Sequence, residues 1–369
     1  MSLLSGLYGR AARFRRAWYG RHPDRTRQLA QPVISVGNLV LGGSGKTPVV
    51  STIARLLLAA GERPVILSRG YGRLRKADGV VVVSDGREVL APTPQSGDEP
   101  QMLARALPGV PVLVSPDRYL AGCLAERTFG CTVHLLDDGF QHVQLARDIN
   151  LLVVSKADLD ERLLPSGRLR EPLGAAAAAD ALLVSGGEED AAAVAARLGA
   201  KPLFHMTPRY DQPRLVEPFG APLPASVGRR TVAVAGIARP ERFFAALRAE
   251  GWNVVEELVF RDHHRFTSRD LESIRRAAVD ARADLVLATE KDAARLDSHV
   301  ARARSGDGEP AWAFLPLQVG IEPTLAFAAW MNDQLSAARR DGPLQRTVQA
   351  ALAGRVAQRP DPGEGGEAA

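Results

Sequence analysis

Short apolar runs alternate with segments of helical period along most of the chain from Pro32 onward. The apolar runs are rich in β-branched residues and lack polar alternation, as expected of strands buried on both faces. In the first half of the chain these predicted strands cover 33–36, 65–67, 80–83, 110–114, 133–136, 151–154 and 181–185. Predicted helices lie between several of them, at 48–60, 99–106, 118–128 and 190–198. This order predicts an α/β fold with a parallel sheet covered by helices on both faces.

A second, smaller unit follows a break in this pattern. Residues 208–230 hold five prolines and no helical period, which predicts a linker. Beyond it, predicted strands at 231–236, 254–260, 284–289 and 312–317 alternate with helices after Pro240 and over 268–281. The expected organisation is an N-terminal helix, a larger α/β domain, the linker, a smaller α/β domain and a disordered tail, over 1–30, 31–207, 208–230, 231–337 and 338–369.

The first 30 residues have a pattern of their own. On a helical wheel one broad arc is apolar and consists of Leu3, Leu4, Leu7, Tyr8, Ala11, Phe14 and Trp18. Arg10, Arg13 and Arg16 lie on the opposite side, and Arg15 lies within the apolar arc. A basic amphipathic helix with aromatic residues is typical of segments that lie in a membrane interface. A helix docked on its own domain, with solvated arginines, is the alternative.

Charge and cysteine content exclude several classes of protein. The net charge is +5, but the first 30 residues alone hold seven arginines and one aspartate. The rest is nearly neutral, which argues against a nucleic-acid-binding surface spread over the body. Two cysteines, Cys123 and Cys131, exclude a disulfide framework and a four-thiolate zinc site, and favour a reducing compartment. Apolar runs stay well short of the roughly 18–20 residues that a membrane-spanning helix needs.

The sharpest motif is a glycine-rich turn between the predicted strand at 33–36 and the helix at 48–60. It consists of Gly42, Gly43, Ser44, Gly45, Lys46 and Thr47. In such a turn backbone N–H groups converge on phosphate oxygens, the lysine reaches the β- and γ-phosphates and the threonine hydroxyl binds Mg²⁺. Val40 stands where the usual pattern has glycine. The turn still predicts a P-loop, and therefore binding of a nucleotide such as ATP.

An acidic pair is placed to help hold the metal. Asp137 and Asp138 follow directly after the apolar run 133–136. P-loop enzymes use a carboxylate at the end of a neighbouring buried strand to bind Mg²⁺. A turn acid or a helix N-cap is the structural alternative.

Hydrolysis and phosphoryl transfer use the same phosphate cradle, but a kinase also needs a group that accepts a proton from the acceptor hydroxyl. Asp98 is one candidate, although an aspartate that opens a helix also fits an N-cap. His263 and His264 follow a predicted strand of the smaller unit. Adjacent histidines give poor zinc geometry, and a hydrogen-bonded loop histidine is the simpler interpretation. Spacing alone does not choose between these roles.

Six motifs together resemble those of the tetraacyldisaccharide 4′-kinase family. They are GGSGKTP at 42–48, SRGYG at 68–72, SGDEP at 96–100, LDDGFQH at 136–142, GRLREP at 167–172 and FRDHHRF at 260–266. The resemblance runs in order from the N-terminal helix to about residue 335, and it departs at GIARP (236–240), where asparagine is expected before the proline. It implies two α/β/α domains with the active site in the cleft between them.

The resemblance also implies an activity. The enzyme would transfer the γ-phosphate of ATP to the 4′-hydroxyl of an acylated glucosamine disaccharide 1-phosphate in lipid A biosynthesis. It would act at the cytoplasmic face of the inner membrane and bind the membrane surface through the N-terminal helix. We expect no nucleic acid and no obligate protein partner.

Individual roles follow from the resemblance. Asp98 would accept the hydroxyl proton with His263 as its partner, and the two would meet only when the cleft closes. Lys46 and Thr47 keep their P-loop roles. The remaining expected residues bind Mg²⁺ or phosphate; they are Asp137, Asp138, Gln141 and Glu171 near the metal, and Arg170 and Arg118 near phosphate.

Two other functions are compatible with the P-loop by itself. One is an NTPase that acts as a switch or assembly factor, which predicts slow hydrolysis without an acceptor. The other is a kinase for a small soluble metabolite, for which the N-terminal helix would be only structural. Lys291, in Thr-Glu-Lys-Asp, is interpreted as a surface salt-bridge residue.

Overall fold

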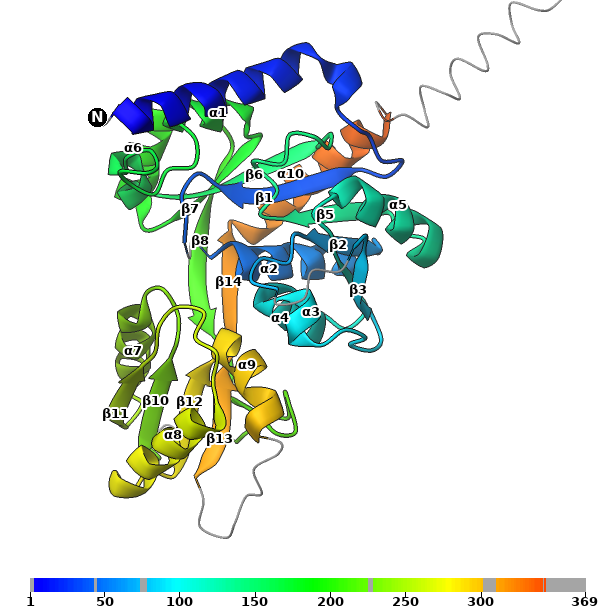
Figure 1. Cartoon of the computed structure of the whole chain (residues 1–369). Helices are drawn as coiled ribbons and strands as arrows, with labels where there is room; N and C mark the ends of the chain where they lie inside the picture. The colour runs from blue at the N-terminus through cyan, green and yellow to red at the C-terminus, as the bar shows by residue number, and fades with distance from the viewer. Residues whose placement is uncertain are drawn as a thin grey trace, which may run out of the picture.

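The structure is a computed structural model that describes residues 3–42, 45–73, 78–224, 228–300, 310–340 and 342. Two α/β domains of unequal size lie one above the other in Figure 1, and the N-terminal helix lies across the outer end of the larger one. In this part of the chain no helix combines the length and the apolar character needed to cross a bilayer. The predicted fold class is confirmed.

The larger domain is built on a nine-stranded sheet with the order β14-β8-β7-β6-β1-β5-β2-β4-β3. Its strands are β1 (Val33–Asn38), β2 (Pro64–Ser68), β3 (Val81–Asp85), β4 (Pro111–Val114), β5 (Val133–Asp137), β6 (Ile149–Ser155), β7 (Ala181–Ser185), β8 (Leu203–Tyr210) and β14 (Leu317–Glu322). The inner strands are parallel, whereas the edge strands β3 and β14 are antiparallel to their neighbours. The predicted parallel sheet is therefore present, with antiparallel edges.

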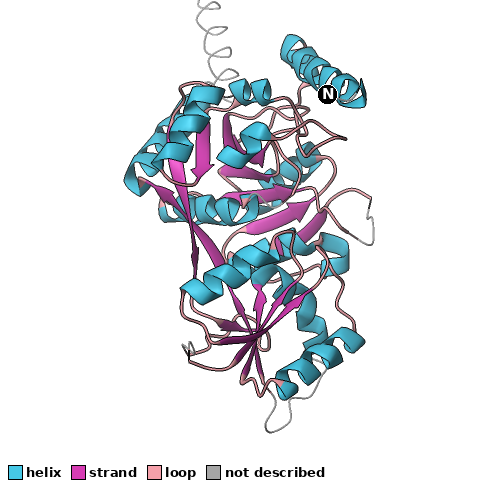
Figure 2. Ribbon diagram, turned by 90° about the vertical axis from the view of Figure 1, so that its left-hand side faces the viewer, coloured by secondary structure: helices cyan, strands magenta, loops and turns pink. Residues whose placement is uncertain are grey.

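Helices cover both faces of this sheet, as Figure 2 shows. Successive side chains of a strand point to opposite faces. Ile34 and Val36 of β1 pack under α2 (Lys46–Ala59), α4 (Asp98–Ala106) and α10 (Thr324–Arg340). Val33 points to the other face, which α5 (Arg118–Phe129) and α6 (Glu188–Leu198) cover. The short elements are η1 (Pro23–Arg25), α3 (Thr93–Ser96), η2 (Lys156–Asp160) and η3 (Leu173–Ala178).

The smaller domain repeats this architecture on a five-stranded sheet with the order β11-β10-β12-β13-β9. The strands are β9 (Arg214–Leu215), β10 (Thr231–Ala235), β11 (Val254–Val259), β12 (Leu285–Thr289) and β13 (Ala311–Leu315), and all but β9 are parallel. One face is covered by α7 (Pro240–Ala249), and the other by α8 (Ser268–Asp280) and α9 (Glu290–Val300). Each face has its own apolar core.

The chain passes between the two domains twice, through β8 and β14. These strands pair antiparallel, with Tyr210 opposite Leu317, and Figure 1 shows them side by side between the two domains. The predicted linker 208–230 therefore begins inside a strand. It also contains β9, which joins the smaller sheet.

The C-terminal boundary also differs from the expected one. The predicted smaller domain, 231–337, includes β14 and α10, yet both belong to the larger domain. The apolar face of α10 explains this, because Phe327, Met331 and Leu335 are buried in the core under the large sheet. The helix ends at Arg340 and not before the predicted tail at 338–369. Residues 343–369 lie outside the described residues.

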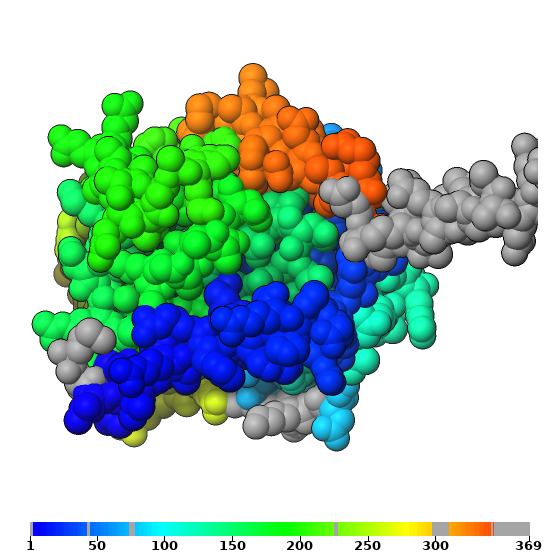
Figure 3. Space-filling view, turned by 90° about the horizontal axis from the view of Figure 1, so that it is seen from above, coloured from blue at the N-terminus to red at the C-terminus, as the bar shows by residue number. Residues whose placement is uncertain are grey.

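The N-terminal helix α1 (Leu3–Arg21) docks on the larger domain through a narrow strip. Ser5 and Gly9 are buried there, and the Ser5 hydroxyl donates to the carbonyl of Leu163 at 3.1 Å. Most of the predicted apolar arc points to solvent: Leu3, Leu7 and Phe14 are exposed by 89%, 60% and 69%. Figure 3 looks down on this helix, which crosses one face of the larger domain.

Candidate active site

The glycine-rich turn and the acidic pair meet at the carboxyl edge of the large sheet. β1 lies between β5 and β6, and Val36 of β1 is the parallel partner of Asp137. The turn that follows β1 therefore lies beside the acids that end β5, at the edge where ligands bind in such sheets. Gly45 has a φ of 79° just before α2, a conformation that favours glycine. Gly43 and Ser44 lie outside the described residues.

Four of the predicted residues, Lys46, Asp138, Arg170 and Gln141, form one polar cluster around Asn38. The Lys46 ammonium lies 3.0 Å from Asn38 Oδ1 and 3.5 Å from Asp138 Oδ1. Arg170 donates from Nη1 to Asp138 Oδ2 at 2.8 Å and from Nη2 to Asn38 Oδ1 at 3.1 Å. Asn38 was not predicted. A polar residue that ends an otherwise apolar strand is the signal that points to it.

The two acids differ in charge state. Burial, followed by the negative charges of Glu99 and Asp138, raises the pKa of Asp137 to about 7. Burial also works to raise the pKa of Asp138, but Lys46 and Arg170 outweigh it, and this pKa is lowered. Among the described residues, Oδ1 of Asp137 and Oδ1 of Asp138 are both buried without a hydrogen-bond partner, although the Lys46 ammonium lies 3.5 Å from the Asp138 oxygen. Buried carboxylate oxygens of this kind are costly unless a cation joins them, so they fit a divalent metal.

The other residues expected near phosphate and metal occupy different places. Gln141 accepts from Arg170 at 3.2 Å and belongs to the cluster around Asn38. Glu171 is paired with Arg16 of α1 at 2.6 Å, so its carboxylate helps to hold that helix. Arg16, expected on the solvated side of α1, thus faces the domain. Thr47 is buried in the first turn of α2.

Arg118 is a buried cation near the acids. Arg118 is the first residue of α5, and its Nε has no hydrogen-bond partner among the described residues. Burial and the neighbouring Arg69 lower its pKa to about 10, against the opposing charges of Asp138 and Asp137. A buried guanidinium with an unused donor, close to the P-loop, is suited to bind an anion.

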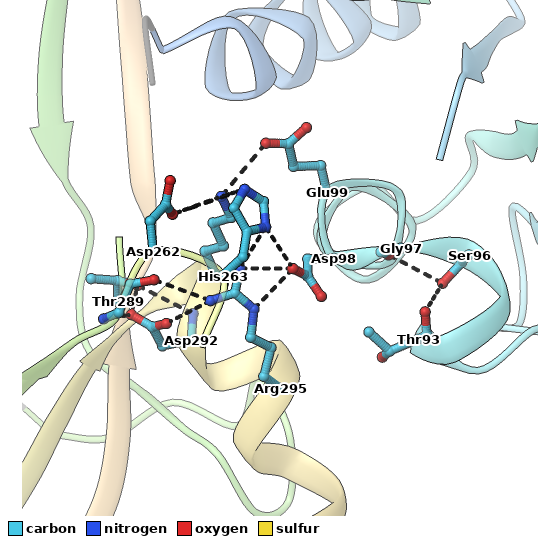
Figure 4. A network of polar contacts seen from close by, with 12 residues as sticks. Thr93, Ser96, Gly97, Asp98, Glu99, Asp262, His263, Thr289, Asp292 and Arg295 are labelled. Atoms are coloured by element: carbon cyan, nitrogen blue, oxygen red, sulfur yellow. Dashed lines mark hydrogen bonds and ion pairs between the residues drawn. The ribbon is translucent and has the colours of Figure 1, made fainter. Parts of the chain in front are cut away.

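Asp98 and His263 are in contact across the two domains, as Figure 4 shows. His263 Nδ1 lies 3.2 Å from Asp98 Oδ2. Asp98 is the first residue of α4, and Gly97 is the N-cap, so the N-cap alternative for Asp98 is wrong. A Cβ at Gly97, which has a φ of 88°, would lie 2.7 Å from the carbonyl oxygen of Tyr71. The residue before Asp98 is therefore restricted to glycine.

Arg295 completes this pair and was missed in the sequence. Its Nε and Nη2 donate to Asp98 Oδ2 at 2.9 and 2.7 Å. Burial works to raise the pKa of Asp98, but the hydrogen bonds from His263 and Arg295 lower it to about 2. Arg295 is held in turn by Asp292, at 3.0 Å from Nη1. No spacing rule relates Arg295 to Asp98, because the two lie in different domains.

Lys291 was predicted as a surface salt-bridge residue and lies instead at the interdomain contact. Its ammonium is 3.1 Å from His263 Nε2 and 3.7 Å from Glu99 Oε1. Since Glu99 also acts on the pKa of Asp137, Glu99 and Lys291 connect the acidic pair to the Asp98–His263 contact. The two halves of the predicted site are therefore adjacent.

The remaining candidates have structural roles. His264 Nε2 is 3.2 Å from Asp270, which belongs to the capping box of α8, and its ring contacts Phe260 and Phe266. Cys131 is buried, and burial followed by the charge of Glu126 raises its pKa to about 12. These positions agree with a hydrogen-bonded loop histidine and an unreactive thiol.

Comparison with known proteins gives concordant matches. The family model described as Tetraacyldisaccharide-1-P 4'-kinase matches residues 1–336. A tetraacyldisaccharide 4'-kinase of Geobacter sulfurreducens is 40% identical over 307 residues, 82% of this chain and 85% of the relative. One of Syntrophus aciditrophicus is 39% identical over 350 residues, 89% of this chain and 90% of the relative. A crystal structure of LpxK from Aquifex aeolicus in complex with ATP aligns with a TM-score of 0.73 and 32% identity, over 90% of this chain and 97% of that one.

Proposed function

This chain belongs to the tetraacyldisaccharide-1-phosphate 4′-kinase family, and from that membership we propose that it transfers the γ-phosphate of ATP to the 4′-hydroxyl of an acylated glucosamine disaccharide 1-phosphate. It is thus a kinase of lipid A biosynthesis. One observation carries the chemistry: a P-loop with its acids lies beside an acid–histidine pair contributed by two domains. A nucleotide-dependent switch would not need the acid–histidine pair.

The P-loop side of the site binds and orients the nucleotide. Lys46 lies at the start of α2, where backbone N–H groups and the helix N-terminus favour a phosphate. Its ammonium is held by Asn38 and Asp138, which aim it before any ligand binds. We propose that Arg118 contacts a phosphate of ATP or of the lipid, because its Nε is buried and unpaired.

The Asp98 carboxylate orients the acceptor hydroxyl and takes its proton. Its pKa of about 2 keeps it ionised at neutral pH, so it is a weak base but a permanent hydrogen-bond acceptor. This suffices for phosphoryl transfer, because the loose transition state needs positioning and charge stabilisation more than early proton removal. Each contact of the carboxylate with another described residue ends on Oδ2, so Oδ1 is available to the hydroxyl.

We propose that Asp137, Asp138 and the Thr47 hydroxyl hold the Mg²⁺ that accompanies ATP. Oδ1 of Asp137 supports this assignment, because it is buried and has no hydrogen-bond partner among the described residues, and Oδ1 of Asp138 is contacted only by Lys46 at 3.5 Å. When bound, the ion neutralises charge that develops on the β- and γ-phosphates. Glu171, committed to Arg16, is no longer proposed as a ligand.

The raised pKa of Asp137 predicts pH-dependent metal binding. Because its pKa is about 7, Asp137 is mostly protonated below pH 7. It must then release its proton before it can bind a cation. We expect affinity for Mg²⁺–ATP to drop by up to about tenfold per pH unit there, with up to one proton released on binding. Calorimetry at pH 6–8 in buffers of different ionisation enthalpy measures this release.

Asp137→Asn serves as the reference for that titration. Protonation of the nucleotide itself is the same for both proteins and cancels in the comparison. The wild type should therefore release more protons than Asp137→Asn below pH 7. Equal proton release by both proteins would remove Asp137 from the metal site.

Transfer of label decides the function directly. The protein is incubated with ATP labelled at the γ-phosphate and with the acylated disaccharide 1-phosphate, and the products are separated by thin-layer chromatography. The proposed kinase moves label to the lipid, whereas a switch releases only labelled phosphate. Equal activity on the deacylated disaccharide would favour a soluble metabolite as substrate.

We propose further that α1 binds the cytoplasmic surface of the inner membrane, where its lipid substrate lies. The outward apolar residues of α1 and the arginines beside them support this. The double variant Leu7→Ser, Phe14→Ser should reduce flotation with anionic vesicles several-fold and leave the docked strip at Ser5 and Gly9 unchanged. Added salt should weaken the binding of the wild type.

Val279→Ser is the matched control for this experiment, because Val279 is equally exposed, by 61%, but lies on α8 of the smaller domain. It should float like the wild type. If the double variant also floats like the wild type, α1 is not the membrane anchor.

A further inference from the structure

Lys291 lies at the contact between the two domains, and the reaction described above assigns it no function. It lies on α9 with a side chain only 19% exposed. Its ammonium is 3.1 Å from His263 Nε2, and 3.7 Å from carboxylate oxygens of Glu99 and Asp262. The shortest of these three contacts is the one with the imidazole nitrogen. A lysine that only formed salt bridges would lie closer to the carboxylates.

This contact constrains the proton on the imidazole. An ammonium has three donors and no acceptor, so Nε2 of His263 must accept. A neutral histidine that accepts at Nε2 carries its proton on Nδ1. Nδ1 lies 3.2 Å from Asp98 Oδ2, so the proton points at the carboxylate. The contacts at both ring nitrogens therefore favour the tautomer with the proton on Nδ1.

The opposite tautomer satisfies fewer partners. With the proton on Nε2, an N–H would face the Lys291 ammonium, and the lone pair of Nδ1 would face the Asp98 carboxylate. Only Arg295 would gain a hydrogen bond, because its Nη2 lies 3.2 Å from Nδ1 and could donate to the lone pair there. That Nη2 already donates to Asp98 Oδ2 at 2.7 Å, so it does not depend on His263.

The surroundings of Nε2 show what Lys291 prevents. The carboxylate of Asp262 is 3.9 Å from Nε2 and 3.7 Å from the Lys291 ammonium. Without the lysine, this carboxylate is the nearest acid to Nε2 in the described part of the chain, and it favours a proton there. Nδ1 would then repel Asp98, and the hydrogen bond from His263 to Asp98 would be lost, leaving those from Arg295.

We propose that Lys291 is a positioning residue that fixes His263 in the Nδ1–H tautomer, so that His263 donates to Asp98 Oδ2 and leaves Oδ1 to the acceptor hydroxyl. The consequence for turnover rests on the proposed kinase function, whereas the tautomer does not. His263 also has a φ of 59°, an uncommon conformation for a non-glycine residue. Its ring is therefore held by these contacts and by its backbone together.

The tautomer is measured by ¹⁵N NMR of the histidine side chains of the full-length protein, with His263→Gln to assign the signal. In the wild type we expect His263 to carry its proton on Nδ1. In Lys291→Met, which keeps the length of the side chain and removes the donors, the Nε2–H form should become populated. Lys291→Arg, which also only donates, should retain the wild-type tautomer.

Kinetics give the second readout. Lys291→Met should lower kcat by about 10- to 100-fold, the range found when a group that orients a functional histidine is removed, with KM for ATP unchanged. Lys291→Arg should recover a large part of kcat. Lys156→Met is the control, because Lys156 pairs with Asp190 on the surface of the larger domain, and it should match the wild type.

An unchanged His263 tautomer in Lys291→Met overturns the proposal, as does an unchanged kcat. If the wild type itself transfers no phosphate to the lipid, the proposed function fails. The NMR comparison then still decides whether Lys291 sets the tautomer.

Discussion

Replacing Asp98 by asparagine should lower kcat by about 10²- to 10⁴-fold, the usual contribution of a group that accepts a proton in the transition state. Affinity for ATP should stay within about twofold, because Asp98 lies on α4 and not on the P-loop. Asparagine keeps the shape of the side chain, and its amide oxygen can still accept from Arg295. Label transfer measures kcat, and calorimetry measures the affinity for the nucleotide.

The alanine variant at this position tests a second property. Asp98→Ala leaves Arg295, whose side chain is 5% exposed, without its carboxylate partner across the interface. We therefore expect Asp98→Ala to weaken the contact between the domains in addition to the loss of turnover, since Arg295 loses two hydrogen bonds to Asp98 and keeps only its pairing with Asp292. Asp190→Asn, at a surface salt bridge, is the control. Near-wild-type turnover of Asp98→Asn would remove Asp98 from the mechanism.

Lys46→Met should impair both nucleotide binding and transfer. The ammonium is the proposed P-loop cation for the β- and γ-phosphates, and it also offsets the charge of Asp138, 3.5 Å away. We expect kcat/KM for ATP to fall by about 10²- to 10³-fold, the effect of losing one aligned donor to a transferring group. A rise in the dissociation constant for ATP should accompany it, in contrast to Asp98→Asn.

Lys201→Met is the matched control, because Lys201 donates to backbone carbonyls at the end of η3, such as that of Ala177, and lies outside the site. Its kinetics should equal those of the wild type. Wild-type affinity and turnover in Lys46→Met would show that the turn at 42–47 does not grip the phosphates. The Asp98 and Lys46 variants together separate chemistry from binding.

Most strands and helices could be predicted because each depends on local pattern, whereas β8, β9 and β14 were not predicted. β1 and β5 are buried on both faces and therefore appear as continuous apolar runs, and the glycine-rich turn marks where β1 meets α2. The division at the C-terminus was wrong for a reason that local pattern does not contain. Strand β14 mixes polar and apolar residues and has no clear strand pattern, and only its pairing with β8 returns the chain to the larger sheet.

Candidate site residues could be named where chemistry restricts the residue type within a motif, and the structure brings Lys46 next to Asp138 and Asp98 next to His263. Arg295 and Lys291 could not be named in this way, because each acts on a residue that is distant in sequence. Asn38 lies between these cases: it ends a predicted strand, but its role requires Lys46 and Arg170 to converge on it. Glu171 fitted a motif for metal binding, yet the packing of α1 brings Arg16 to it.

The sequence by itself determined the position of the glycine-rich turn, the acids that end β5, the two-domain α/β class and the amphipathic first helix, since backbone geometry and side-chain periodicity act over a few residues. The tertiary structure decided which charges face one another. The Asp98 carboxylate with a pKa of about 2 and the Asp137 carboxylate with a pKa of about 7 are the same residue type. Arg295 and His263 from another domain lower the first, and burial beside other acids raises the second. Such differences arise from distances between groups far apart in the chain, which folding alone sets.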